Sequence, residues 1–345
     1  MYTPLCERLG LEVPIIQAAM GGASCPALAA AVSNAGGLGM LALSWSTLDA
    51  VRDQIRKTRA LTDRPFGANL VLHWPQDERL AVCLDEGVPV ISFFWGDPAP
   101  LVERTHAGGA KVLHTVARAE EARRAVDCGV DVLVAQGWEA GGHVWSEVAT
   151  LPLIPAVVDA VKPTPVAAAG GIADGRGLAA ALSLGAAGAW IGTRFLGSEE
   201  AAIHPRYREL LLAAKETDTV HGDLFDIGWP NARHRVLRNT TVAAWEAAGR
   251  PPSGARPGEG EVIATSLTRG DIVRYRSATP ATDCEGDVEA MSLWAGQGVN
   301  LLRRVQPAAA IVAEIVAEAD TALRQASAAV AAQPPSPPRR VAATR

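Results

Sequence analysis

The sequence lacks the features that mark several common classes of protein. Its five cysteines are widely spaced and include no CxxC pair, which argues against a disulfide framework and a zinc site. No stretch reaches the roughly 18 uninterrupted apolar residues of a membrane-spanning helix. The N-terminal segment contains Glu7 and Arg8 and has no apolar core of signal-peptide length. These absences predict a cytoplasmic protein that has no membrane anchor and keeps its cysteines reduced.

Charge of one sign is also scarce, and three catalytic motifs are missing. The formal net charge is −5, and no cluster of Lys and Arg forms a continuous basic face, so nucleic acid is not an expected partner. The chain has no HExxH motif, no GxSxG nucleophile elbow, and no GxGxxG turn after its first predicted strand. We therefore expect no metal site and no Rossmann dinucleotide-binding domain.

The chain does contain a long alternation of two kinds of segment. From Pro14 to Ala214, short apolar segments alternate with longer Ala-rich segments that carry charges at helical spacing. Continuous apolar runs are typical of strands buried on both faces of a parallel sheet. The eight predicted strands are residues 14–20, 38–44, 66–72, 88–96, 110–117, 130–137, 165–171 and 187–195. Eight such units predict an α/β fold, a (β/α)8 TIM barrel, rather than an open doubly wound sheet.

The alternation stops after the eighth unit, which divides the chain into three parts. Residues 1–215 are predicted to form the barrel. Residues 216–298 contain Gly, Pro and aromatic residues without clear periodicity, and residues 305–325 return to a helical pattern. We therefore expect residues 216–330 to form an appended lobe or lid whose final helix packs on the barrel. Residues 331–345 are rich in Pro, Ala and Arg and are predicted to be a disordered tail.

Two glycine turns follow the last two predicted strands. Gly170 and Gly171 end the seventh strand, and Gly192 and Thr193 end the eighth. Glycines let backbone N–H groups approach an anion closely, and barrels of this kind favour phosphate at the loops after strands seven and eight. One such turn alone would indicate only a tight strand-to-helix connection. Two turns on consecutive strands predict a phosphate site.

Polar residues follow two other predicted strands. Gln136 ends the sixth strand and is followed by Gly141 and His143 in a glycine-rich loop. A lone histidine is most often structural, but His143 lies in a loop suited to close contact with a flat ligand, and histidine is readily tuned as an acid or base. Asn69, near the end of the third strand, is a polar residue in an apolar run, and its amide can both donate and accept hydrogen bonds. An Asn at this position is also compatible with a structural role in the core.

These segments together resemble the nitronate monooxygenases, also called 2-nitropropane dioxygenases. The matching segments are residues 14–22, 66–70, 136–143, 168–177 and 191–195, and residues 294–298 are similar to a glycine-rich segment that these enzymes carry before their final helix. The resemblance implies FMN, bound non-covalently, and places His143 at the catalytic histidine. The residues that it implies for FMN are Met20, Gly21, Asn69, Gln136, Gly141, Gly170, Gly171, Trp190, Ile191, Gly192 and Thr193.

The resemblance also implies a reaction. The family oxidises alkyl nitronates with O2 to a carbonyl compound and nitrite, through a flavin semiquinone. His143 would orient the small anionic substrate or take a proton from a neutral nitroalkane, and both roles stay open. The chain departs from many relatives at Trp138 and at residues 144–147, including Glu147, beside the expected substrate. A homodimer is a candidate assembly.

Two other functions remain open. An FMN-dependent enoyl-acyl-carrier-protein reductase shares the fold and closely similar motifs, here Glu-Ala-Gly-Gly-His at residues 139–143 and Gly-Thr-Arg-Phe at residues 192–195. That enzyme takes hydride from NADH or NADPH. A protein of another class would bind flavin without turnover. Reduction of the flavin by a nicotinamide cofactor, by a nitronate, or by neither separates the three functions.

Overall fold

The computed structural model describes residues 1–331, and the predicted tail therefore lies outside the described residues except for Ala331. Eight parallel strands form one sheet. They are β1 (Ile15–Gln17), β2 (Gly39–Ala42), β3 (Phe66–Val71), β4 (Val90–Phe94), β5 (Lys111–Val116), β6 (Val132–Gln136), β8 (Val166–Ala169) and β9 (Gly188–Ile191). Each strand lies inside one of the predicted segments.

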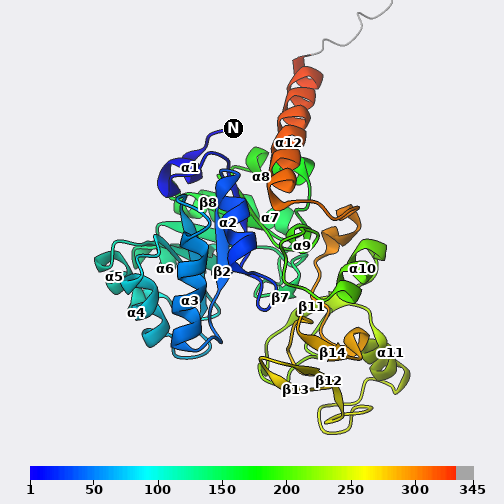
Figure 1. Ribbon diagram of the computed structural model, residues 1–345. Helices are drawn as coiled ribbons and strands as arrows, with labels where there is room; N and C mark the ends of the chain where they lie inside the picture. The colour runs from blue at the N-terminus through cyan, green and yellow to red at the C-terminus, as the bar shows by residue number, and fades with distance from the viewer. Residues whose placement is uncertain (332–345) are drawn as a thin grey trace, which may run out of the picture.

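The sheet closes on itself. Its strand order is β1-β9-β8-β6-β5-β4-β3-β2, and an isolated parallel bridge between Ile16 and Leu38 joins the two edge strands. Figure 1 shows the strands surrounded by helices. The barrel helices are α2 (Pro26–Asn34), α3 (Leu48–Arg59), α4 (Asp77–Asp85), α5 (Ala99–Ala107), α6 (Ala119–Asp127), α7 (Thr150–Val161), α8 (Gly175–Ser183) and the short α9 (Thr193–Leu196), with α1 (Pro4–Leu9) before the first strand. The predicted TIM barrel is confirmed.

Local chemistry explains how the helices begin and how the strands pack. The side chains of Thr47 and Asp174 accept hydrogen bonds from backbone amides in the first turns of α3 and α8. Along each strand, side chains alternate between the barrel interior and the helix layer. Met40 is fully buried in the inner cluster, while the adjacent Leu41 packs under the helices. Each barrel strand therefore needs apolar side chains on both of its faces.

Between the barrel and the final helix, the chain forms two small antiparallel sheets, two α-helices and two 3-10 turns. One sheet has the order β10-β11-β7 and the other β13-β12-β14. Their bounds are β7 (Gly142–His143), β10 (Thr219–Gly222), β11 (His234–Leu237), β12 (Val262–Ser266), β13 (Gly270–Val273) and β14 (Cys284–Gly286). The helical elements are α10 (Pro205–Ala213), α11 (Thr240–Ala247), and the 3-10 turns η1 (Val288–Ala290) and η2 (Gln297–Leu301). Since β7 belongs to the barrel, the first sheet joins the barrel to the later residues.

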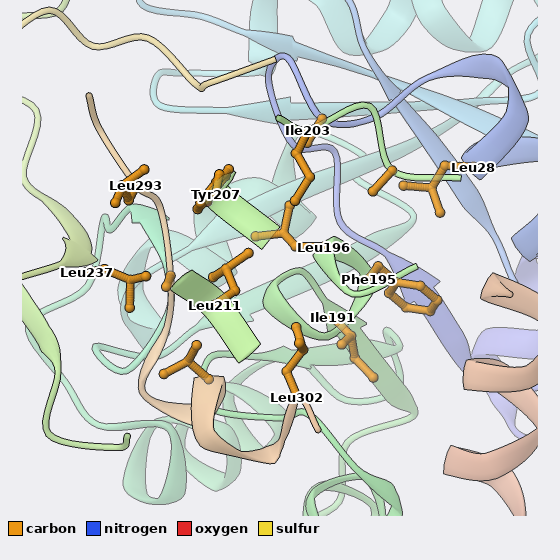
Figure 2. Packing of buried hydrophobic residues seen from close by; sticks show 14 of the residues in the cluster. Leu28, Ile191, Phe195, Leu196, Ile203, Tyr207, Leu211, Leu237, Leu293 and Leu302 are labelled. Atoms are coloured by element: carbon orange, nitrogen blue, oxygen red, sulfur yellow. The ribbon is translucent and has the colours of Figure 1, made fainter. Parts of the chain in front are cut away.

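A continuous hydrophobic cluster connects the barrel with these later residues. Figure 2 shows Phe195 and Leu196 of α9 near Tyr207 and Leu211 of α10. The same cluster includes Leu237, Leu293 and Leu302. The final helix, α12 (Ala308–Ala331), packs on α8, where a Cβ added to Gly175 would lie 2.3 Å from the backbone nitrogen of Ala319. Among residues 1–331, no helix is both long enough and apolar enough to cross a membrane.

Candidate functional site

The predicted site residues gather at the carboxyl ends of adjacent barrel strands. Gln136 pairs in register with Ala169, which pairs in turn with Trp190. Gln136, Trp190 and Asn69 alternate with residues that pack under the helices, so their side chains lie on the inner face of the barrel. This end of the barrel is where enzymes of this fold place their active sites.

The two glycine turns lie side by side, as predicted, because β8 and β9 are neighbouring strands. Gly171 has a φ of +70°, in the left-handed region that glycine adopts readily, and it is exposed. Within residues 1–331, the backbone amides of Gly171, Ile172 and Gly192 donate no hydrogen bond to a protein acceptor. Unpaired amides from two adjacent turns suit an anion such as phosphate. The residues present therefore fit the phosphate of a flavin mononucleotide.

The glycine-rich segment at residues 294–298 packs against both turns. The amide of Gly296 donates to the hydroxyl oxygen of Thr193 at 3.0 Å. A Cβ added to Gly298 would lie 2.8 Å from the carbonyl oxygen of Gly171, so a larger residue there would push the segment away. A Cβ added to Gly141 would lie 2.3 Å from the Gly296 nitrogen. Gly141 thus packs against the later segment, and its predicted contact with flavin stays a prediction.

Met20, Gly21 and Asn69 lie around the same strand ends. A Cβ added to Gly192 would lie 3.9 Å from the sulfur of Met20, so the first and last strand ends are close together. A Cβ added to Gly21 would lie 2.9 Å from the indole of Trp45. The amide nitrogen of Asn69 donates to the carbonyl oxygen of Ser92 at 3.2 Å. The flavin contacts predicted for these three residues stay predictions.

His143 forms the short strand β7 and is held from two directions. It pairs with His234 of β11, and the side-chain amide of Gln136 donates to the His143 carbonyl oxygen at 3.1 Å. The oxygen of the same amide accepts a hydrogen bond from the Trp145 nitrogen at 2.8 Å. Gln136 therefore positions the loop that carries His143. Among residues 1–331, the buried Nε2 atom of His143 has no hydrogen-bond partner.

Aromatic rings surround His143. The indole of Trp229 stacks on its imidazole, with ring centroids 3.8 Å apart and planes inclined by 29°. Trp294 lies at 5.1 Å and His234 at 5.7 Å, measured between the same centroids. Burial lowers the pKa of His143 well below its ordinary value, and the nearby His234 and His73 lower it further. The imidazole is therefore neutral near pH 7 and available as a proton acceptor.

Sequence reasoning missed most of this aromatic environment. Trp45, Trp74 and Trp95 follow or end the second, third and fourth predicted strands, so their positions at the barrel mouth were a usable signal. Trp229 and His234 come from residues 216–298, which have no periodicity that would have placed them. Their approach to His143 depends on the pairing of β11 with β7.

The structure shows what the residues that depart from the family pattern contact. Glu147 is exposed and pairs with Arg233 at 2.9 Å, so it points to solvent rather than toward the anion site. Arg194 pairs with Glu314 at 3.3 Å rather than with Glu147. Trp138 lies under the buried Arg235, whose guanidinium carbon is 4.2 Å from the centre of the indole. None of these contacts opposes an anion at the glycine turns.

A metal centre is not indicated. Across residues 1–331, no group of three or more His, Cys, Asp or Glu side chains is arranged to hold a metal ion. All five cysteines are free, in agreement with the absence of a disulfide framework.

Comparison of the sequence with known proteins identifies the family of this chain. The family model for nitronate monooxygenase matches residues 3–78 and 73–318. A nitronate monooxygenase from Paraburkholderia phytofirmans is 33% identical over 93% of this chain and 96% of its own length. A (3aS,4S,5R,7aS)-5-hydroxy-7a-methyl-1-oxo-octahydro-1H-indene-4-carboxyl-CoA dehydrogenase from Mycobacterium tuberculosis is 41% identical over 72% of this chain and 70% of its own.

Two solved structures agree with that placement. FabK from Thermotoga maritima has 35% identity and a TM-score of 0.83, covering 95% of this chain and 99% of its own. A nitroalkane oxidase from Streptomyces ansochromogenes has 30% identity and a TM-score of 0.75, covering 94% and 99%. The relatives include more than one kind of oxidoreductase, and the family implies a flavin cofactor. With its barrel, its paired glycine turns and the histidine beside the strand ends, the chain belongs to the nitronate monooxygenase family.

Proposed function

We propose that the protein is an FMN-dependent oxidoreductase that uses O2 to convert alkyl nitronates to a carbonyl compound and nitrite. The observation that carries this proposal is His143, whose Nε2 atom is buried and has no hydrogen-bond partner among residues 1–331. An unpaired buried polar atom costs free energy, so its presence beside the strand ends is typical of a group that meets a ligand. The partners would be a small anionic substrate and O2.

The residues have separate tasks in this proposal. The amides of Gly171, Ile172 and Gly192 would bind the FMN phosphate, and Thr193 would add a hydroxyl. FMN, when bound, supplies the electron acceptor for the substrate. The neutral imidazole of His143 would donate a hydrogen bond to a nitro oxygen, or accept the proton of a neutral nitroalkane at its unprotonated ring nitrogen. The aromatic rings around it would exclude water from the reacting carbon.

The test is an anaerobic reduction of the FMN-loaded protein. Propionate 3-nitronate is expected to bleach the flavin absorption, and in air it is expected to release nitrite. NADH and NADPH are expected to leave the flavin oxidised. Nitrite release that is no faster than in a solution of free FMN would contradict the proposal.

One observation favours a second candidate, an oxidoreductase of larger thioester substrates. The relative from Mycobacterium tuberculosis is named as a dehydrogenase of a bicyclic CoA thioester and is 41% identical to this chain. The enoyl-acyl-carrier-protein reductase expected as an alternative also acts on a thioester. For the reductase, anaerobic NADH or NADPH would bleach the flavin, and no nitrite would form. A flavin-binding protein without turnover would resist reduction by nitronate and nicotinamide alike.

A further inference from the structure

The mouth of the barrel holds a cluster of tryptophans, which we define as Trp45, Trp74, Trp95, Trp145 and Trp229. Trp229 lies at its centre: its ring centroid is 4.9 Å from that of Trp74, 5.2 Å from that of Trp95 and 6.1 Å from that of Trp45. Aromatic residues make up only 5% of the chain, so their concentration here is specific to this end of the barrel. The tryptophan cluster therefore combines residues from three barrel loops, the β7 loop and the chain after β10.

The tryptophan cluster has two unfavourable features that packing alone does not require. The Nε1 atom of Trp229 is buried and has no hydrogen-bond partner among residues 1–331, whereas a phenylalanine would fill the space with no polar atom. Trp95 has a φ of +61°, a left-handed conformation that is strained for a bulky residue. Strain and unpaired polar atoms are common at sites that bind ligands. Trp45 and Trp145 remain 52% and 37% exposed, so the cluster reaches solvent.

The tryptophan cluster presents flat apolar indole surfaces beside His143, and its side chains carry no charge. The charges that act on the pKa of His143 come from two histidines rather than from a carboxylate or a guanidinium. The Trp229 indole is only 3% exposed and stacks on the imidazole of His143, so it is the cluster residue that lies directly against the proposed catalytic ring. A flat ring in the substrate can stack on Trp229 or on the neighbouring indoles of the cluster. A short alkyl chain has no flat face and gains little from these contacts.

We propose that the tryptophan cluster selects substrates whose reacting carbon carries a flat, uncharged ring system, and that Trp229 is the residue that recognises this ring. The inference deepens the proposed function, on which it rests for the identity of the reacting carbon. It predicts that the protein prefers aryl nitronates to small aliphatic ones such as propionate 3-nitronate, because the selective element is the ring face beside His143.

The first test measures binding without turnover. The FMN-loaded protein is titrated with 2-naphthol and with decahydro-2-naphthol, which have the same carbon skeleton and one hydroxyl each but differ in flatness. The shift of the flavin absorption band reports binding. We expect about tenfold tighter binding of 2-naphthol, as one to two aromatic contacts would give. Equal binding of the two compounds overturns the inference.

Variants assign the preference to Trp229. Trp229→Ala is expected to reduce the preference to about twofold, and Trp229→Phe, which keeps a flat face, is expected to retain most of it. Trp245→Phe is the matched control, because Trp245 lies on α11 and donates to the Pro251 carbonyl oxygen, away from the cluster. A Trp229→Ala protein that keeps both its flavin and the full preference overturns the assignment. If Trp229→Ala loses flavin, the exposed Trp45→Ala replaces it and is expected to lower the preference about threefold.

The outcomes separate this inference from the proposed reaction. The initial rates of nitrite release are compared for the nitronates of phenylnitromethane and nitroethane. Preferential binding of 2-naphthol without nitrite release from either nitronate would reject the reaction and keep the inference. Nitrite release with no preference for the flat alcohol or the aryl nitronate would keep the reaction and reject the inference.

Discussion

His143 combines three properties that suit a histidine that meets a ligand. Its Nε2 atom is buried, it has no hydrogen-bond partner among residues 1–331, and it lies in a loop fixed by Gln136. Burial and two neighbouring histidines keep its pKa well below the ordinary value. A neutral imidazole can interact with the substrate as hydrogen-bond donor or proton acceptor, whichever tautomer is present.

Removal of this ring should separate binding from turnover. His143→Ala is expected to retain flavin, because the predicted phosphate contacts lie at the glycine turns, and to lose about 100-fold or more of kcat/KM for a nitroalkane. His106→Ala is the control, since His106 is exposed on α5 and pairs with Asp131. Flavin content and nitrite release are measured on the same samples. Normal turnover by the His143 variant would show that the catalytic assignment is wrong.

The low pKa of His143 also predicts a pH profile. A histidine with an ordinary pKa would lose its basic form below about pH 6.5. Here the neutral form persists to lower pH, because its pKa is lowered. With a neutral nitroalkane as substrate, kcat/KM is therefore expected to stay level between about pH 7 and pH 6 and to decline only below that range. A titration step centred near pH 6.5 would indicate a solvated base.

The glycine turns after β8 and β9 act as a pair. Within the part of the chain that the structure describes, the amides of Gly171 and Gly192 on neighbouring strand ends have no hydrogen-bond acceptor, and the segment around Gly296 packs against the same turns. The pairing of β8 with β9 brings the two turns together, so the geometry belongs to the sheet rather than to either loop.

Gly171→Ala tests this element. Gly171 has a left-handed φ of +70°, which is strained for alanine, and an added Cβ would lie 3.3 Å from the Cβ of Glu139. The turn must therefore shift, and FMN is expected to bind about tenfold or more weakly. Gly109→Ala is the matched control, because Gly109 has a φ of +82° but precedes β5 at the opposite end of the barrel. Fluorescence titration of the apoproteins with FMN measures both. Equal weakening by the two substitutions would assign the effect to general strain.

The elements that the sequence predicted are those with a local signal. The eight strands are continuous apolar runs, and the turns at Gly170 and Gly192 follow two of them, so both could be placed from the pattern alone. The pairing of His143 with His234 and the stacking of Trp229 join segments far apart in the chain. No periodicity marks residues 216–298, so these contacts required the folded structure.

Across the protein, several histidines are held in their neutral form by full or partial burial. Burial lowers the pKa of His114 and His221 to about 4, and it also lowers those of His143 and His234. In the unfolded chain these side chains titrate near pH 6.5. Below that pH the unfolded state therefore binds more protons than the folded state, and the free energy of unfolding must fall.

This linkage predicts acid sensitivity. The stability is expected to be fully present above about pH 6.5 and to decline between about pH 6.5 and 4, by about 1.4 kcal/mol per pH unit for a buried histidine such as His114 and by less for the half-buried His221. Urea unfolding at a series of pH values measures the decline. Substitution of His114 by Gln is expected to reduce the slope, because this histidine lies on the helix-facing side of β5, away from the strand ends. A stability that does not change over this range would contradict the burial of neutral histidines.

We propose that the two adjacent glycine turns bind the phosphate of FMN. The most direct measurement is a titration of the apoprotein with FMN and with riboflavin, which differ only in that phosphate. Charge-assisted hydrogen bonds from several backbone amides predict that riboflavin binds about 100-fold or more weakly. Equal affinity for the two flavins, or no binding of FMN, would contradict the account.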